Sequence, residues 1–95
     1  MSILQFQNSC KLIFKLFTLK IKLIWDFRGV NGSGTAKHHV IHLNEFIERE
    51  SITGTTAHHE SLSEFHSIAY LITPKENMIM LRDALKPNRG EKCDE

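Results

Sequence analysis

The six histidines of this chain are crowded into a short part of its sequence. Both flanks lack the residue, because all six fall between positions 38 and 66, as His38, His39, His42, His58, His59 and His66. Imidazole binds borderline metal ions and changes its charge near neutral pH. The crowding therefore points to chemistry of two kinds, metal binding or proton transfer.

Three of these positions have the spacing of a helical metal site. His38 and His42 are one helical turn apart and would share a face, with Glu45 close beside them. Two imidazoles and a carboxylate could hold a divalent zinc-like ion and leave one position open for water. In the competing interpretation these side chains form only a solvated face, on which Arg49 pairs with Glu45 or repels a cation.

A zinc protease is not expected from this segment. The protease pattern H-E-x-x-H places a glutamate directly after its first histidine, and this glutamate serves as the general base. Here the residue after His38 is His39. His39 also borders the apolar stripe of the predicted helix, so we expect it to be a half-buried residue with one hydrogen bond.

A second pair of histidines is predicted on a β-hairpin. If Glu60 faces Phe65 across a four-residue loop, His59 falls opposite His66 on one face of the sheet. Two such imidazoles could share a metal ion or a proton. A slip of one residue would bring His58 there instead, and in the alternative interpretation these residues are simply solvated.

Four further residues are candidates for ligand binding, beside the half-buried His39. Trp25 and Tyr70 lie on predicted strands of one sheet and could line a pocket, although membership of the core is the default. Asp26 could orient a histidine as a general base. Arg28 precedes a glycine-rich turn at a helix start, where a carboxylate or phosphate could bind. That turn matches neither the phosphate-loop pattern nor the dinucleotide pattern.

The periodicity of apolar residues predicts a single α+β domain with the order β-α-β-β-α. Its strands are expected at 20–27, 53–60 and 65–72, and its helices at 35–50 and from Thr73 to Pro87. Ala36, Val40, Leu43 and Ile47 would form the buried stripe of the first helix. Thr73, Pro74 and Glu76 have the spacing of a capping box that starts the second helix.

This order predicts a ferredoxin-like antiparallel sheet that lacks its last strand and has both helices on one face. Its other face would expose apolar area, so we expect a homodimer, or a fourth strand or a helix from the N-terminal segment. We divide the chain into a basic and apolar extension (1–19), one domain (20–87) and a polar tail (88–95).

Charge and composition exclude several classes of partner. Residues 1–25 carry a net charge of +4 and residues 26–95 carry −3, so the domain has no broad basic face and nucleic-acid binding is not expected. No stretch is apolar enough to cross a membrane. The two cysteines, Cys10 and Cys93, have no metal or redox spacing, and free thiols in a reducing cytoplasm are expected.

Three functional hypotheses follow. The first is a domain that binds a ligand or partner without catalysis, because no catalytic motif is complete. The second is a protein that binds a divalent metal ion through His38, His42 and Glu45, or through His59 and His66. The third is a cofactor-free enzyme acting on a small molecule, of the dimeric α+β barrel type, with a histidine as its general base.

Overall fold

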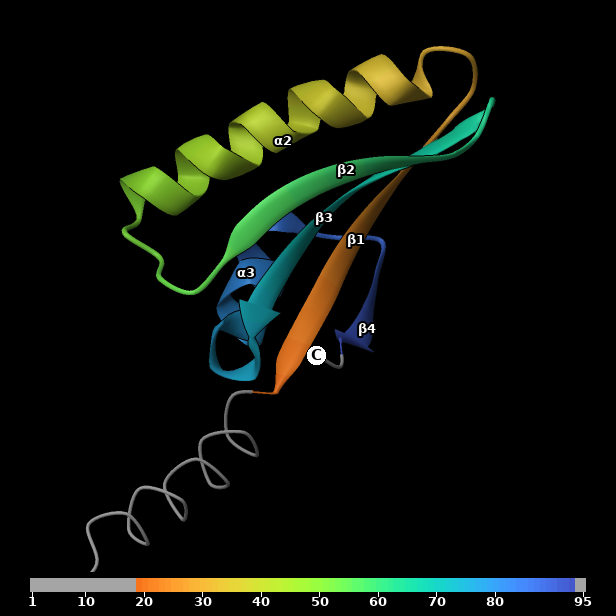
Figure 1. Cartoon of the computed structure of the whole chain (residues 1–95). Coiled ribbons are helices and arrows are strands. Elements are labelled where there is room, and N and C mark those ends of the chain that lie inside the picture. The colour runs from red at the N-terminus through yellow and green to blue at the C-terminus, as the bar shows by residue number, and fades with distance from the viewer. Residues whose placement is uncertain (1–18, 94–95) are drawn as a thin grey trace, which may run out of the picture.

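Four strands and two α-helices make up the part of the chain that the computed structural model describes, residues 19–93 (Figure 1). In chain order the elements are β1 (Lys20–Arg28), α2 (Gly32–Arg49), β2 (Thr56–Ser63), β3 (His66–Pro74), a short 3₁₀ helix η1 (Lys75–Asn77), α3 (Met78–Leu85) and β4 (Arg89–Cys93). The prediction of an α+β protein is confirmed. The extension predicted at 1–19 lies outside the described residues except for Leu19.

The strands form one antiparallel sheet in the order β2-β3-β1-β4. Alternation along β1 sends Leu23 and Trp25 to the face on which α2 and α3 pack. The opposite face, called the open face below, carries Ile24 and Asp26 from β1. The core between sheet and helices is built from Leu23, Trp25, Ala36, Leu43, Ala69, Leu71 and Leu81.

The buried stripe of α2 is confirmed, whereas the helix begins three residues before the predicted start. Ala36 and Leu43 are buried, and Val40 and Ile47 pack against the same core. The early start depends on Gly32, since a Cβ there would lie 2.7 Å from the backbone oxygen of Phe27. Glycine therefore allows the first turn to pack directly on β1.

The capping box predicted at Thr73 is wrong. Thr73 is fully buried at the end of β3, and its hydroxyl hydrogen-bonds that of Thr55 at 2.8 Å. The chain then passes through η1, and α3 begins only at Met78. Burial of the threonine against a neighbouring segment thus outweighs the local capping preference.

Strand β4 occupies the segment that the sequence analysis treats as a polar tail. Residues Arg89–Cys93 pair with β1 from Ile24↔Arg89 to Lys20↔Cys93. Backbone hydrogen bonds hold this short edge strand, so it needs no apolar alternation and gives no sequence signal. The chain thus supplies a fourth strand itself, and the sheet is not the three-stranded one that the sequence predicted.

The open face leaves less apolar area uncovered than the dimer prediction assumed. Ile24 and Ile68 lie on it, yet they are only 1% and 3% exposed. Their cross-strand neighbours Tyr70, Asp26 and Arg89 flank them on the same face.

Candidate functional site

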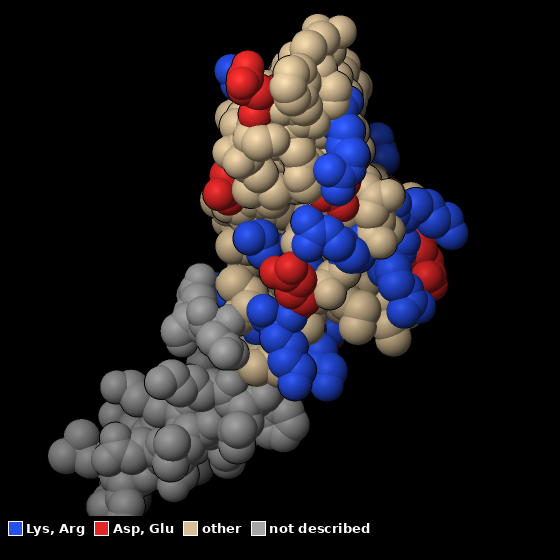
Figure 2. Space-filling view, turned by 90° about the vertical axis from the view of Figure 1, so that its right-hand side faces the viewer, with Lys and Arg blue, Asp and Glu red and all other residues tan. Residues whose placement is uncertain are grey.

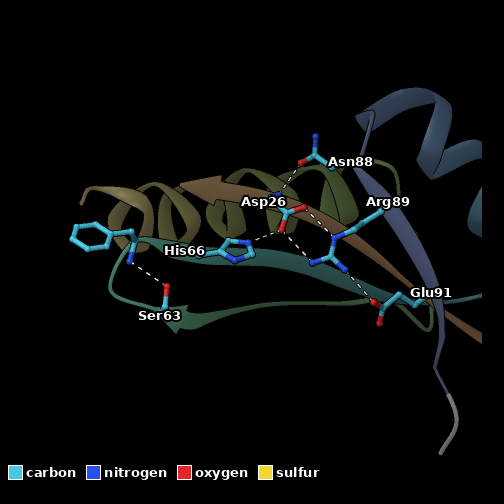
Figure 3. A network of polar contacts seen from close by, with 7 residues as sticks. Asp26, Ser63, His66, Asn88, Arg89 and Glu91 are labelled. Carbon is cyan, nitrogen blue, oxygen red and sulfur yellow. Dashed lines mark hydrogen bonds and ion pairs between the residues drawn. The ribbon is translucent and has the colours of Figure 1, made fainter. Parts of the chain in front are cut away.

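Asp26 is the centre of a polar network on the open face that joins three strands (Figure 3). Its carboxylate accepts a hydrogen bond from His66 Nε2 of β3 at 2.7 Å and two from the Arg89 guanidinium of β4, each at 3.1 Å. Its backbone N–H donates to Asn88 Oδ1 at 2.7 Å. Arg89 reaches further to Glu91 at 3.0 Å.

The network perturbs the charge equilibria of its members. Hydrogen bonds from Arg89, and then from His66, lower the pKa of Asp26 from 3.8 to about 2, although partial burial opposes the change. The hydrogen bond that Arg89 donates to Asp26 in turn raises the pKa of Arg89. Asp26 is therefore ionised at every physiological pH, and Arg89 remains its cationic partner.

Chemically, this arrangement orients an imidazole. Because the Asp26 carboxylate only accepts, His66 Nε2 carries the hydrogen, which leaves Nδ1 as the nitrogen able to take up a proton. Such a pair has the chemistry of a general base and its orienting carboxylate. The network also fastens β3 and β4 to β1, through side chains that are 18% exposed for Asp26 and 19% for His66.

The second arrangement of polar groups is on the exposed surface of α2. His38 Nε2 lies 3.0 Å from His42 Nε2, and His42 Nδ1 lies 3.1 Å from Glu45 Oε1. The rings of His38 and His42 meet edge to face, with their centroids 4.5 Å apart. Of the three side chains predicted to form a helical metal site, His42 thus contacts both His38 and Glu45.

Arg49 does not take part in this arrangement. Its guanidinium pairs with Glu50 at 3.3 Å and lies over the Phe46 ring. Glu45 is therefore paired with His42. The alternative interpretation of this helix face paired Glu45 with Arg49 instead.

The predicted pairing of His59 with His66 is wrong. β2 continues to Ser63 with a bulge between Ser61 and Ser63, so the turn contains only Glu64 and Phe65. His59 is then paired with Ala69, whereas His66 is paired with Arg28 of β1 and Ser63 of β2. The two histidines lie on opposite faces of the sheet and cannot share an ion.

Within residues 19–93, no group of three or more His, Cys, Asp or Glu side chains is placed to hold a metal ion. The five predicted ligands therefore do not form one site. His58, the residue that a register slip would have used, stacks on Tyr70 with the ring centroids 5.2 Å apart and hydrogen-bonds Thr56 at 2.8 Å.

His39 occupies the core edge predicted for it, but without the expected partner. Its ring lies against those of Trp25 and Phe27, at centroid distances of 5.0 and 5.4 Å. Its Nε2 is buried and has no hydrogen-bond partner in the described part of the chain. Burial is the main cause that lowers the pKa of His39, and the charges of His42 and His38 lower it further.

We expect His39→Leu to stabilise the protein by about 1 kcal/mol, because it removes a buried polar atom that has no partner. The lowered pKa means that the unfolded chain takes up a proton first as the pH falls below 6.5, so His39 costs stability in acid. The difference between the melting temperatures at pH 7.5 and pH 5.5 should be smaller in His39→Leu than in the wild-type protein. The exposed His59→Gln serves as the control, and an unchanged difference in His39→Leu would contradict the assignment.

The predicted ligand-binding residues do not converge on one pocket. Trp25 and His39 lie between the sheet and α2, and Trp25 Nε1 donates to the backbone oxygen of Leu85 at 3.0 Å. Asp26, Arg28 and Tyr70 lie on the open face, where the Lys22 ammonium is 4.2 Å from the centroid of the Tyr70 ring.

Sequence reasoning missed Asn88 and Arg89 because they fall in the segment taken as a tail. A signal was present in the run Lys86 to Gly90, where proline, asparagine and glycine mark a turn that could return the chain to the sheet. Cys93 at the end of β4 is a free thiol, and Cys10 lies outside the described residues.

No helix within residues 19–93 is long and apolar enough to cross a lipid bilayer. Comparison of the sequence with protein-family models and with curated proteins, and comparison with solved structures, finds no match.

Proposed function

We propose that this protein is a small ligand-binding domain whose ligand is a divalent transition-metal ion such as zinc, bound by His38 and His42 of α2. The distance of 3.0 Å between the two Nε2 atoms supports this proposal most directly. Two nitrogen ligands of a tetrahedral ion, each bonded at 2.0–2.1 Å, are separated by about 3.3 Å. A small movement of either exposed ring would therefore admit the ion.

The hydrogen bond between His42 and Glu45 favours this use of the pair. With Nδ1–H donating to the Glu45 carboxylate, the neutral His42 ring has its lone pair on Nε2, directed toward His38. A carboxylate that fixes the tautomer of a ligating histidine is the usual outer partner of zinc-bound imidazole. The ion would take the place of the hydrogen that His38 Nε2 donates in this arrangement, and that hydrogen would pass through solvent to Nδ1 of the same ring.

Two imidazoles leave further coordination positions for water or for a second copy of the chain. We propose a homodimer in which each copy contributes its histidine pair to a shared four-coordinate ion. Ile41 supports this arrangement, since it is 54% exposed and lies one helical turn from His38 and Glu45. An exposed isoleucine beside the pair offers an apolar contact across such an interface.

We also propose that the architecture is ferredoxin-like. The element order β-α-β-β-α-β, the central position of β1 and β3, and the two helices on one face support this assignment. Residence in a reducing cytoplasm stays a prediction, based on cysteines without metal or redox spacing.

Calorimetric titration of the untagged, chelator-free protein with Zn²⁺ tests the proposal. We expect saturable binding that is lost in His42→Ala and kept in His58→Ala, a matched removal of an exposed histidine from β2. Glu45→Gln should weaken binding by about tenfold, as expected for loss of an outer-shell partner. Zinc at a hundred times its Kd should stabilise the wild-type protein by about 2.7 kcal/mol.

Sedimentation of the same samples tests the shared ion. One zinc per two chains with a dimer that dissociates in chelator supports the homodimer, whereas one zinc per monomer shows that water completes the site. Equal zinc affinity of His42→Ala and the wild type would contradict the metal proposal itself.

A further inference from the structure

A groove of about 420 Å³ lies between α3 and β4, on the side of the sheet that the helices cover. Its apolar lining residues are Ile21, Leu23, Met78 and Pro87, and its charged lining residues are Arg82, Lys92, Arg89 and Glu91. Arg89 and Glu91 pair with each other at 3.0 Å, which leaves Arg82 and Lys92 as the other charged side chains of the groove. The volume falls in the range of sites that hold small molecules, about 300–1,000 Å³. None of the predicted ligand or metal residues lines this groove.

The groove exists because α3 is short and because β4 places few side-chain atoms on this face. α3 has eight residues and buries only Leu81, so it does not extend over β4. Gly90 and Lys92 are the β4 residues on this face, paired with Leu23 and Ile21. A Cβ on Gly90 would lie 3.4 Å from Leu23 Cδ2, so the missing side chain keeps the floor open.

The wall of the groove is held in place before any ligand arrives. The Asn88 backbone N–H donates to the oxygen of Ile24 at 2.8 Å, and its side chain accepts from the Asp26 N–H. Arg89 is fixed by Asp26 on the opposite face of the sheet. A preformed site of this kind loses little conformational freedom on binding.

The cations of the groove are available for an anion. Within residues 19–93, the Lys92 ammonium makes no hydrogen bond or ion pair, and the Arg82 guanidinium pairs only with its exposed neighbour Asp83, at 3.3 Å. Figure 2 shows Lys and Arg gathered over the lower half of the side on which β4 lies. Residues 75–93 carry five Lys or Arg against three Asp or Glu, and residues 29–65 carry two against five.

We propose that this groove binds a small organic anion, a carboxylate with an apolar chain or ring as its body. The apolar part would lie along Leu23 and Met78 beside Gly90, and the carboxylate would meet Arg82 and Lys92 at the rim. Charge complementarity supports this class of ligand, because an apolar floor alone would accept neutral molecules equally well.

Titration of the ¹⁵N-labelled full chain with octanoate, followed by amide chemical shifts, tests the proposal. We expect saturable shifts centred on Gly90, Lys92 and Met78. The neutral isostere octanamide should bind about two- to fivefold more weakly, the effect expected of one partly exposed charge pair. Lys92→Gln should lower the affinity for octanoate by a similar factor, while Lys37→Gln on α2 should leave the affinity for octanoate unchanged.

Gly90→Val fills the floor and should abolish the shifts. Its backbone lies outside the positive-φ region and valine suits a strand, so its melting temperature is expected to stay close to that of the wild type. Octanoate binding by a folded Gly90→Val protein, or equal affinity for octanamide, would overturn the proposal. Should Gly90→Val not fold, the Lys92→Gln and octanamide comparisons decide the matter alone.

Discussion

Asp26→Ala is expected to lower the free energy of unfolding by about 2 kcal/mol, the size usual for hydrogen bonds to a charged group. The carboxylate accepts hydrogen bonds from β3 and β4 at once, so its removal releases both His66 and Arg89. Urea unfolding followed by the fluorescence of the single tryptophan, Trp25, measures the change.

Asp26 should also make the free energy of unfolding depend on pH in acid. The pKa of Asp26 is lowered from 3.8 to about 2, so its contribution is complete above about pH 4 and is lost as the pH falls through about 2. Since the side chain is partly exposed, we expect about 1–2 kcal/mol from this source. In Asp26→Asn this part of the acid dependence should disappear.

Asp83→Asn is the matched control for the network. Asp83 is 64% exposed and, in the part of the chain that the structure describes, pairs only with Arg82, its neighbour in the sequence. Its replacement should change stability by less than about 0.5 kcal/mol. An Asp26→Ala protein as stable as Asp83→Asn would show that the network contributes nothing to folding.

Gly32→Ala and Gly34→Ala are expected to change stability in opposite directions, although both glycines lie in the first turn of α2. The Cβ of alanine at 32 would meet the Phe27 oxygen at 2.7 Å, whereas at 34 nothing lies within 4 Å. We expect a loss of about 2 kcal/mol at Gly32, from the forced shift of helix or strand. At Gly34 we expect a gain of about 0.5–1 kcal/mol, because alanine favours the helix and restricts the unfolded chain.

Thermal unfolding separates these two variants clearly. In a domain of this size each kcal/mol shifts the melting temperature by about 4–8 °C. Gly32→Ala should therefore melt well below the wild type and Gly34→Ala slightly above it. Equal melting temperatures would mean that α2 does not pack on β1 as closely as the structure has it.

The elements with strong periodicity were predictable from the sequence. β1 alternates apolar and polar residues, and α2 carries its apolar residues at 36, 40, 43 and 47, so burial decides both. The contact between His38 and His42 was predictable for the same reason, because a helix brings residues four apart together wherever it forms.

The parts that depend on distant residues were not predictable. The bulge between Ser61 and Ser63 shifted the hairpin register, and with it the position of His59. The hydrogen bond that Asp26 N–H donates to Asn88 and the one that Arg89 donates to Asp26 span 62 and 63 residues. No local pattern encodes such contacts, and β4 offered no apolar repeat. The turn residues between Lys86 and Gly90 indicated only that the chain could return to the sheet, and not which residues it would meet there.

The position of β4 at the edge of the sheet has a consequence for local unfolding. Among the described strands, β4 is a five-residue edge strand that pairs only with β1. Edge segments with few buried contacts open at a lower free energy than the core, so β4 is expected to detach while the rest of the sheet persists. When it detaches, the Asp26 carboxylate loses its Arg89 partner and one wall of the α3–β4 groove is lost, whereas His66 on β3 keeps its hydrogen bond to Asp26 on β1. The ion pair between Asp26 and Arg89 and the occupancy of the groove are therefore thermodynamically linked through a single opening equilibrium.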